Sequence, residues 1–400
     1  MNTSRALETA VRGRRYTETA ALFGGLDGHD RTAYRVCACR ALEAARRTEV
    51  PEPVETLRRL LCCAAWIEGH ATHLHLVQVP GLLGYPDAAE LARGELEAVT
   101  RGLELHRAGA ELATAIGEDV LHVGGPHRPT PRAALTRLRP RLQDAVSAAM
   151  ETAYWISGIG IPESGIDMPL LALDDPVTGP VAHGRARYPI DGGVGVLAST
   201  GLGFPITEFE SFVSRPRTGP LRTGRAALRG SKATLTGPLA RNALCARLLH
   251  PAARSSADRA KLTAAERNPY RSALIRAVEL VHALEEAEAL IEHYEPADPP
   301  PRRPTTEPGQ GRGSCATESP SGLLYQRYDL KPDGTVGTAR LIGPDELNRT
   351  AVELDLRRTE RTARHRDPAI GQDRLAELRA VLANNYEACV PGSFPAPAER

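Results

Sequence analysis

Long stretches with helical periodicity constrain the fold of this chain more than any other feature of its sequence. Over residues 54–79 the side chains suited to burial fall on one stripe of a helix, namely Leu57, Leu60, Leu61, Ala64, Ala65 and His75. The same periodicity predicts long helices over residues 88–116, 131–156 and 270–294. Helices of this length must bury their apolar faces against one another, so we expect a long-helix bundle.

Shorter segments predict a smaller β component. Over residues 168–205, short apolar runs alternate with turn signals, which favours a small antiparallel sheet. Residues 323–330 and 336–342 flank a turn and predict a hairpin. Two more helices are expected at residues 345–363 and 371–385. The predicted class is therefore α+β, predominantly helical, with small antiparallel β elements.

Proline-rich segments mark the parts of the chain outside these elements. Prolines sustain neither a helix nor a central strand, so residues 296–312 are expected to form a connector and residues 390–400 a tail. The sequence shows no internal repeat of fixed period. We therefore expect residues 1–400 to form a single domain.

The composition excludes several classes of function. A net charge of +1 gives no electrostatic reason to bind nucleic acid or an anionic membrane. No apolar run approaches the roughly 20 residues needed to span a bilayer, and the first residues lack a signal-peptide core. The 7 cysteines are odd in number and do not form a disulfide framework. We expect a cytoplasmic protein with reduced thiols.

The segment Asp27-Gly28-His29-Asp30 lies within residues 13–43, which read GRRYTETAALFGGLDGHDRTAYRVCACRALE. This stretch resembles the run "GRsYtE…RICGIC…RALE" of nickel-iron hydrogenase large subunits, particularly of the soluble, bidirectional, cofactor-coupled type. Aligned on the shared RALE at residues 40–43, the two family cysteines fall on Asp27 and Asp30. Cys37 and Cys39 lie too far along the chain to take their place.

Further blocks of the chain resemble this family in the family's order. They are residues 69–73, 82–87, 123–125, 199–202, 237–241, 268–272, 315–322 and 386–389. Together they extend over most of the chain. The resemblance implies the large-subunit fold and a partner similar to a hydrogenase small subunit.

The departures from the family fall on its metal-binding positions. The resemblance implies nickel held by four thiolates, two of which bridge to iron, and the corresponding positions here are Asp27, Asp30, Cys389 and Gly392. Three of the four sulfur ligands are therefore missing. The family's arginine beside the metals is replaced by Ser321 and its C-terminal histidine by Pro395, and its opening strand is not found. Because soft thiolates select nickel and iron, we expect no nickel-iron cluster and no other cofactor.

The resemblance also implies one buried site where the terminal motifs converge. The candidate catalytic residues are Asp27, His29, Asp30, Glu318 and Cys389, and the expected pocket lining adds Ser321, Asp345, Asn348 and Gly392. Asp27 and Asp30 could act as general base and charge partner, or hold a hard cation in place of nickel. The alternative is a relaxed, inactive site that is filled by water. Cys389 is either a nucleophile or ligand, or an idle thiol.

A second group of polar residues superficially resembles a zinc site on a helix: Glu68, His70, His73 and His75. His70 and His73 are one turn apart and could share a face, whereas His75 points elsewhere. The family already carries histidines at the first two positions without zinc. We therefore expect no metal there.

Three functions remain compatible with the sequence. The first, which we favour, is a non-hydrogenase enzyme, for example in secondary metabolism, that acts on a small polar metabolite by acid–base chemistry with Asp27 and Asp30. The second is a non-catalytic structural subunit that docks an iron-sulfur partner similar to a small subunit. The third is an atypical nickel-iron hydrogenase. The first two both place the chain in a heteromeric complex.

Overall fold

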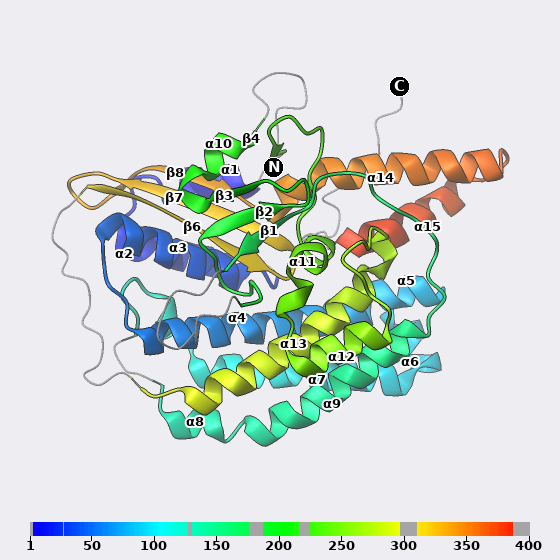
Figure 1. Ribbon diagram of the computed structural model, residues 1–400, viewed down its shortest axis with the longest axis horizontal. Coiled ribbons are helices and arrows are strands. Elements are labelled where there is room, and N and C mark those ends of the chain that lie inside the picture. Colours follow the sequence, from blue (N-terminus) through cyan, green and yellow to red (C-terminus); the bar gives the residue numbers. More distant parts are fainter. Residues whose placement is uncertain are drawn as a thin grey trace.

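The computed structural model describes residues 3–26, 28–126, 130–175, 187–215, 225–296 and 310–386. Most of its long helices lie together in the lower half of Figure 1, and a sheet with its own covering helices lies above them. The candidate site lies on the elements that join these two halves.

Long helices form the larger of the two halves. α4 (Glu52–Thr72) packs against α7 (Leu96–Ile116) and α13 (Ser272–His293), and α13 packs against α9 (Arg139–Ser157). The predicted stripe on α4 faces this core, where Leu57, Leu60, Leu61 and Ala64 are buried and Ala65 is half-buried. The remaining helices of this half are α5 (Val79–Leu83), α6 (Ala88–Gly94), α8 (Arg132–Thr136), α11 (Pro238–Cys245) and α12 (Pro251–Arg259).

Three of the helices predicted as continuous are interrupted. The run 54–79 passes through a π-helical turn, η2 (His73–Gln78), before α5. The run 88–116 divides into α6 and α7 at Glu95, whose backbone leaves helical geometry at φ −132°, ψ 50°. The run 131–156 divides into α8 and α9 because Pro140, in the first turn of α9, cannot continue a preceding helix.

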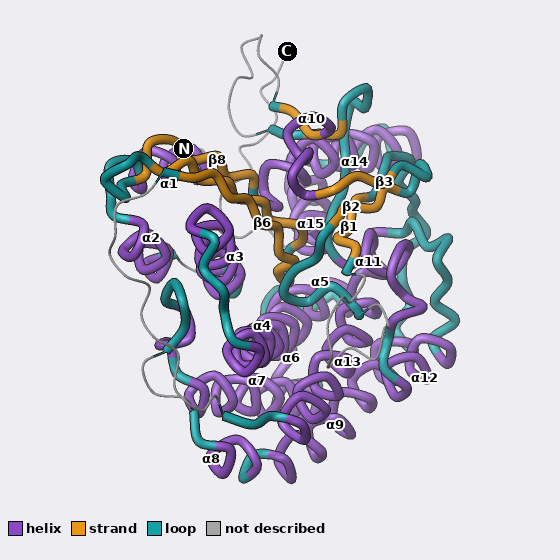
Figure 2. The backbone as a smooth tube through the Cα atoms, turned by 60° about the vertical axis from the view of Figure 1, so that its left-hand side comes forward, coloured by secondary structure: helices purple, strands orange, loops and turns teal. Residues whose placement is uncertain are grey.

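The upper half contains a three-stranded antiparallel sheet in the order β6-β7-β8. The predicted hairpin is confirmed as β7 (Gly322–Leu330) and β8 (Val336–Ile342). β6 (Gly311–Ser319) was not predicted, and its first residues belong to the segment expected to be a connector. Residues 297–309 of that segment lie outside the described residues. β6 packs along α3 (Arg31–Arg46), as the tube in Figure 2 also shows.

Further strands and helices complete the structure. The sheet predicted over residues 168–205 is confirmed as β1 (Leu171–Asp174), β2 (Gly195–Ala198) and β3 (Gly203–Pro205). β4 (Val213–Ser214) pairs with β5 (Ala227–Leu228). The other helices are α1 (Thr3–Val11), α2 (Tyr16–Leu22), α10 (Phe209–Phe212), α14 (Pro344–Arg366) and α15 (Gln372–Ala383). α14 projects beyond the rest of the molecule in Figure 1, with α15 beneath it.

The predicted class, α+β and predominantly helical with small antiparallel sheets, is confirmed. Over the described ranges, no helix has both the length and the apolar character that crossing a bilayer requires.

Candidate functional site

The candidate site centres on the turn that leads into α3. Asp27 lies outside the described residues, as do Cys389, Gly392 and Pro395. Gly28 has φ +89°, a left-handed conformation that glycine adopts without strain, so the chain can turn sharply at this point. Asp30 immediately precedes α3 and is only 7% exposed.

Ser321 brings the β6–β7 turn onto this segment. Its Oγ donates a hydrogen bond of 3.0 Å to Oδ1 of Asp30. Asn348, on α14, fixes the same turn, because its Nδ2 lies 3.5 Å from the Ser321 carbonyl oxygen and its Oδ1 accepts a hydrogen bond of 2.8 Å from the Thr236 backbone N–H. Three of the residues expected in the site, Asp30, Ser321 and Asn348, therefore lie together.

Asp345 lies in the first turn of α14, close enough to Asp30 for the charge of Asp30 to act on it. Burial, together with the negative charges of Glu346 and Asp30, raises the pKa of Asp345 to about 6. This carboxyl group therefore gains or loses its proton at mildly acidic pH.

Glu318 lies deeper in the protein than the sequence suggested. Its Oε1 accepts a hydrogen bond of 3.1 Å from the Leu173 backbone N–H, and its Oε2 accepts one of 2.9 Å from Arg241. Burial raises the pKa of Glu318 to about 7, against the effect of Arg241. Glu318 is thus held by fixed partners rather than directed at an open space.

His29 lines a cavity of about 360 Å³ beside this turn. The side chain rests on Gly69 of α4, where an added Cβ would lie 3.0 Å from the His29 Cβ and 3.1 Å from Pro320. The cavity is lined by Gly28, His29, Arg31, Thr32, Leu61, Ala65, Glu68, Ala110, Ala113, Thr114, Gly117, Glu118 and Leu121. Asp30 and Ser321 do not line it.

Glu68 is the acidic group of this cavity whose pKa is raised. Burial raises it, although His106, His29 and Arg31 oppose the effect. Glu118, the other carboxylate in the lining, is paired with Arg35 at 2.7 Å. The cavity therefore combines a half-buried carboxyl group with an imidazole and the hydroxyls of Thr32 and Thr114.

The three histidines of α4 and η2 have separate partners. His70 Nε2 lies 3.1 Å from Glu279, and His73 Nε2 lies 2.7 Å from the Asn384 carbonyl oxygen. His75 stacks on Trp155, and burial lowers its pKa to about 4. They do not converge on one point, and Glu68 faces the cavity instead.

A different group has the composition of a metal site: His250, His282 and Glu286, whose potential ligand atoms lie within 4.8 Å of one another. His282 Nδ1 accepts a hydrogen bond from the His250 backbone N–H, so the neutral ring carries its proton on Nε2 and offers no free nitrogen. Glu286 is already paired with Arg59 and with His250. We interpret this group as an ion-pair cluster.

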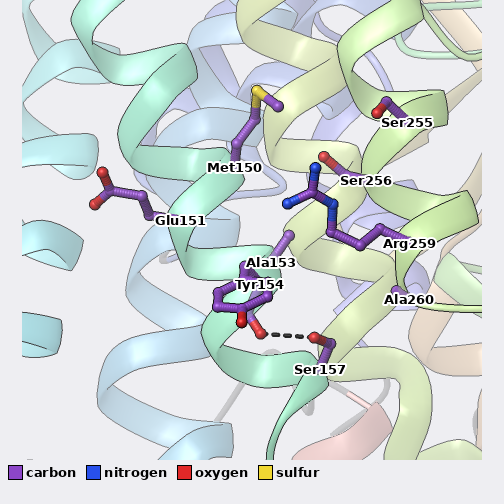
Figure 3. Close-up of a pocket in the computed structure, with 9 residues that line it drawn as sticks. All are labelled: Met150, Glu151, Ala153, Tyr154, Ser157, Ser255, Ser256, Arg259 and Ala260. Atoms are coloured by element: carbon purple, nitrogen blue, oxygen red, sulfur yellow. Dashed lines mark hydrogen bonds between the residues drawn. The ribbon is translucent and has the colours of Figure 1, made fainter.

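A second cavity, of about 210 Å³, lies between α9 and α12 (Figure 3). Arg259 is its only cationic lining residue, and Tyr154 lies at its edge with its carbonyl oxygen accepting a hydrogen bond from Ser157. None of the residues that the sequence indicated for the site lines this cavity.

The chain is 24% identical over 397 residues to "Sulfhydrogenase 1 subunit alpha" of Pyrococcus furiosus, covering 96% of this chain and 88% of that protein. It is 25% identical to "Sulfhydrogenase 2 subunit alpha" of the same organism, with 88% and 81% covered. No protein-family model matches.

Solved structures give the same result for the fold. A crystal structure of an NAD+-reducing [NiFe]-hydrogenase in the H2-reduced state superposes with a TM-score of 0.80 at 20% identity, covering 96% of this chain and 90% of that one. The chain is a homologue of hydrogenase large subunits. A Ni-Fe-Se hydrogenase from Desulfomicrobium baculatum superposes with a TM-score of 0.66 at 15% identity. The family predicted from the sequence motifs is thereby confirmed.

In this large-subunit homologue the described donor groups do not fit a thiolate-bound metal. At Asp30, which the motif alignment matches to a family cysteine, the carboxylate accepts a hydrogen bond from Ser321. The described cysteines are free thiols that lie elsewhere, on α3, α4, α11 and β6. Among the described residues, the turn that leads into α3 therefore offers a carboxylate and no thiolate.

Sequence reasoning missed several buried charges around the site, notably Arg241 and Glu279. Arg241 falls inside one of the motif blocks, and Glu279 lies on a predicted helix. A burial pattern of apolar residues gives no information about charges that are buried in pairs.

Proposed function

We propose that this large-subunit homologue does not assemble a nickel-iron centre and instead binds a small polar molecule in the cavity beside His29. The hydrogen bond from Ser321 to Asp30 carries the first half of this proposal. The acceptor, Asp30, is aligned with a metal-binding cysteine of the family, and the donor, Ser321, is aligned with the family arginine. Both side chains are therefore engaged with each other inside the protein.

The second half rests on the chemistry of the cavity. Glu68, with its raised pKa, and His29 face the same space, so one group can give a proton while the other accepts one. Thr32 and Thr114 supply hydroxyls that can orient a polar ligand. We propose proton transfer to and from a small polar metabolite as the reaction class, with Asp30 contributing a negative charge next to His29 in the chain.

A partner subunit is part of the proposal. The relatives named above are subunits of sulfhydrogenases by their names, and the chain covers most of their length. We therefore propose that the protein works in a complex with a protein similar to a hydrogenase small subunit.

The alternative is a non-catalytic structural subunit. One observation favours it: Asp30 and Glu318, two of the candidate catalytic groups, are both bonded to neighbours inside the protein. In that case the site serves to hold the fold together and needs no ligand.

Variants of the cavity separate the two proposals. Glu68→Gln removes the proposed acid from the cavity, and Glu97→Gln, on the exposed surface of α7, is the matched control. The enzyme proposal expects Glu68→Gln to abolish cellular function while the complex still assembles. If Glu68→Gln and Asp30→Asn both leave function intact, and surface variants that break the complex abolish it, the structural subunit is the correct assignment.

A further inference from the structure

Helix α3 and strand β6 lie unusually close together. A Cβ built on Gly311 would overlap the Ala45 carbonyl oxygen, and one built on Gly313 would overlap the Ala41 carbonyl oxygen. Glycine at alternate strand positions thus lets the two backbones touch. Steps of two residues along β6 match steps of four along α3, because both advance the chain by roughly 6–7 Å.

The next position in this register pairs Cys315 with Cys37. The Cys37 thiol donates a hydrogen bond of 3.3 Å to the Cys315 carbonyl oxygen, and the two side chains also interact directly. One step further, Thr317 Oγ1 donates to the Ala33 carbonyl oxygen at 3.4 Å. The two cysteine side chains therefore meet at the contact between α3 and β6. The contacts of Gly313 and Thr317 on either side of them fix the distance between the helix and the strand.

The two thiols differ in their access to solvent. Cys37 is fully buried, whereas Cys315 is half-buried. Burial raises the pKa of Cys37 well above its usual range, so this sulfur is protected until its neighbour reacts. The guanidinium of Arg40 lies close enough to act electrostatically on both sulfurs. An oxidant from solvent thus reaches Cys315 first.

We propose that Cys315 and Cys37 form a reversible disulfide when the protein encounters a hydroperoxide. The Cys315 sulfur attacks one oxygen of the hydroperoxide and the O–O bond breaks, which gives a sulfenic acid and one molecule of water when the oxidant is hydrogen peroxide, or of alcohol when it is an organic hydroperoxide. The Cys37 sulfur then displaces the sulfenic oxygen, which leaves as water while the S–S bond forms. The two thiols lose two electrons to the peroxide, and a dithiol reductant reverses the reaction.

The bond would lock the two elements that carry the candidate site. α3 begins directly after Asp30, and β6 ends at Ser319, next to the turn that contains Ser321. The inference does not depend on the proposed enzyme activity, because it rests only on the contact between α3 and β6.

Mass spectrometry of the full-length protein tests this inference. The folded protein is treated with hydrogen peroxide, free thiols are blocked with N-ethylmaleimide, and tryptic peptides are mapped. Residues 36–40 form one tryptic peptide that contains both Cys37 and Cys39, so the Cys39→Ser variant assigns the bond and serves as the matched control. We expect residues 36–40 joined to residues 313–327, with the loss of two hydrogen atoms, in both proteins.

Dithiothreitol should restore both reduced peptides. In Cys37→Ser, we expect dimedone to trap the sulfenic acid of Cys315, because the second sulfur is absent. The proposal is wrong if Cys315 of the unmodified chain accumulates as sulfenic or sulfinic acid while Cys37 stays reduced. It is equally wrong if another pair of cysteines is linked, or if neither thiol reacts.

Discussion

Glu318 and Arg241 form an ion pair of 2.9 Å in which neither side chain is exposed to solvent. The same guanidinium binds Glu279 at 2.6 Å and lies 4.4 Å from the centre of the Trp66 ring. Although Glu279 is also buried, Arg241 holds its pKa below the usual range. One guanidinium thus pairs with two carboxyl groups. Burial outweighs this pairing at Glu318 and raises its pKa to about 7, whereas the pairing outweighs burial at Glu279.

Glu318→Gln should change how stability depends on pH. A carboxyl group whose pKa is raised by folding stabilises the protein fully below its unfolded pKa of about 4.5, and this contribution is lost as the pH rises to about 7. At one pKa unit for about 1.4 kcal/mol, the loss is roughly 2–4 kcal/mol. Urea unfolding at a series of pH values should show a shallower decline for the variant. An unchanged decline over this window would contradict the assignment.

Arg241→Met should be strongly destabilising. The change leaves Glu279 and Glu318 buried together without a counter-charge, and breaking a buried pair from one side costs about 3–5 kcal/mol. The matched control is Arg374→Met, because the Arg374–Glu377 pair is 67% and 62% exposed and such pairs contribute about 0–1 kcal/mol. Chemical denaturation of both variants measures the difference. Equal losses would show that the buried pair has no special role.

Gly313→Ala tests the close contact between β6 and α3. An added methyl group meets the backbone of α3, which cannot move as a side chain can, so we expect a loss of about 1–3 kcal/mol. Gly160→Ala is the control, because no atom lies within 4 Å of its added Cβ, and surface changes of this kind stay within about 0.5 kcal/mol. Thermal unfolding of the two variants distinguishes these outcomes.

Ser321→Ala tests the contact between the β6–β7 turn and Asp30. Removing a buried donor to a carboxylate costs about 1–3 kcal/mol, so the free energy of unfolding should fall by this amount. Ser157→Ala, whose hydroxyl bonds the Tyr154 carbonyl oxygen in an exposed place, should change it much less. A variant as stable as the unmodified chain would mean that Asp30 does not depend on Ser321.

The sequence predicted the helical layer well because apolar periodicity is a local signal. α4 and α13 follow directly from their spacing, and the motif blocks predicted the family. The interruptions at Glu95 and at η2 were missed, since both leave the apolar pattern intact. β6 was missed because its first residues end the proline-rich segment expected to be a connector, and its close contact with α3 joins segments far apart in the sequence.

The site was harder to predict than the fold. Motif alignment brought Asp30, Ser321 and Asn348 to one place, but it gave no indication that Glu318 would be held by Arg241. Glu68 was considered only as a metal ligand, although its half-buried carboxyl group faces the cavity. Charges buried in pairs depend on contacts between distant segments, and a single sequence does not contain that information.

Infrared spectroscopy of the full-length protein, purified anaerobically together with any protein that co-purifies, tests the central claim most directly. A nickel-iron centre of this family carries diatomic ligands on its iron, whose stretching bands lie in a region free of protein absorption. With aspartate at two thiolate positions and glycine at a third, we expect no such bands and no stoichiometric nickel. Bands of iron-bound cyanide or carbon monoxide, together with one nickel per chain, would show that the centre is assembled and would contradict the account.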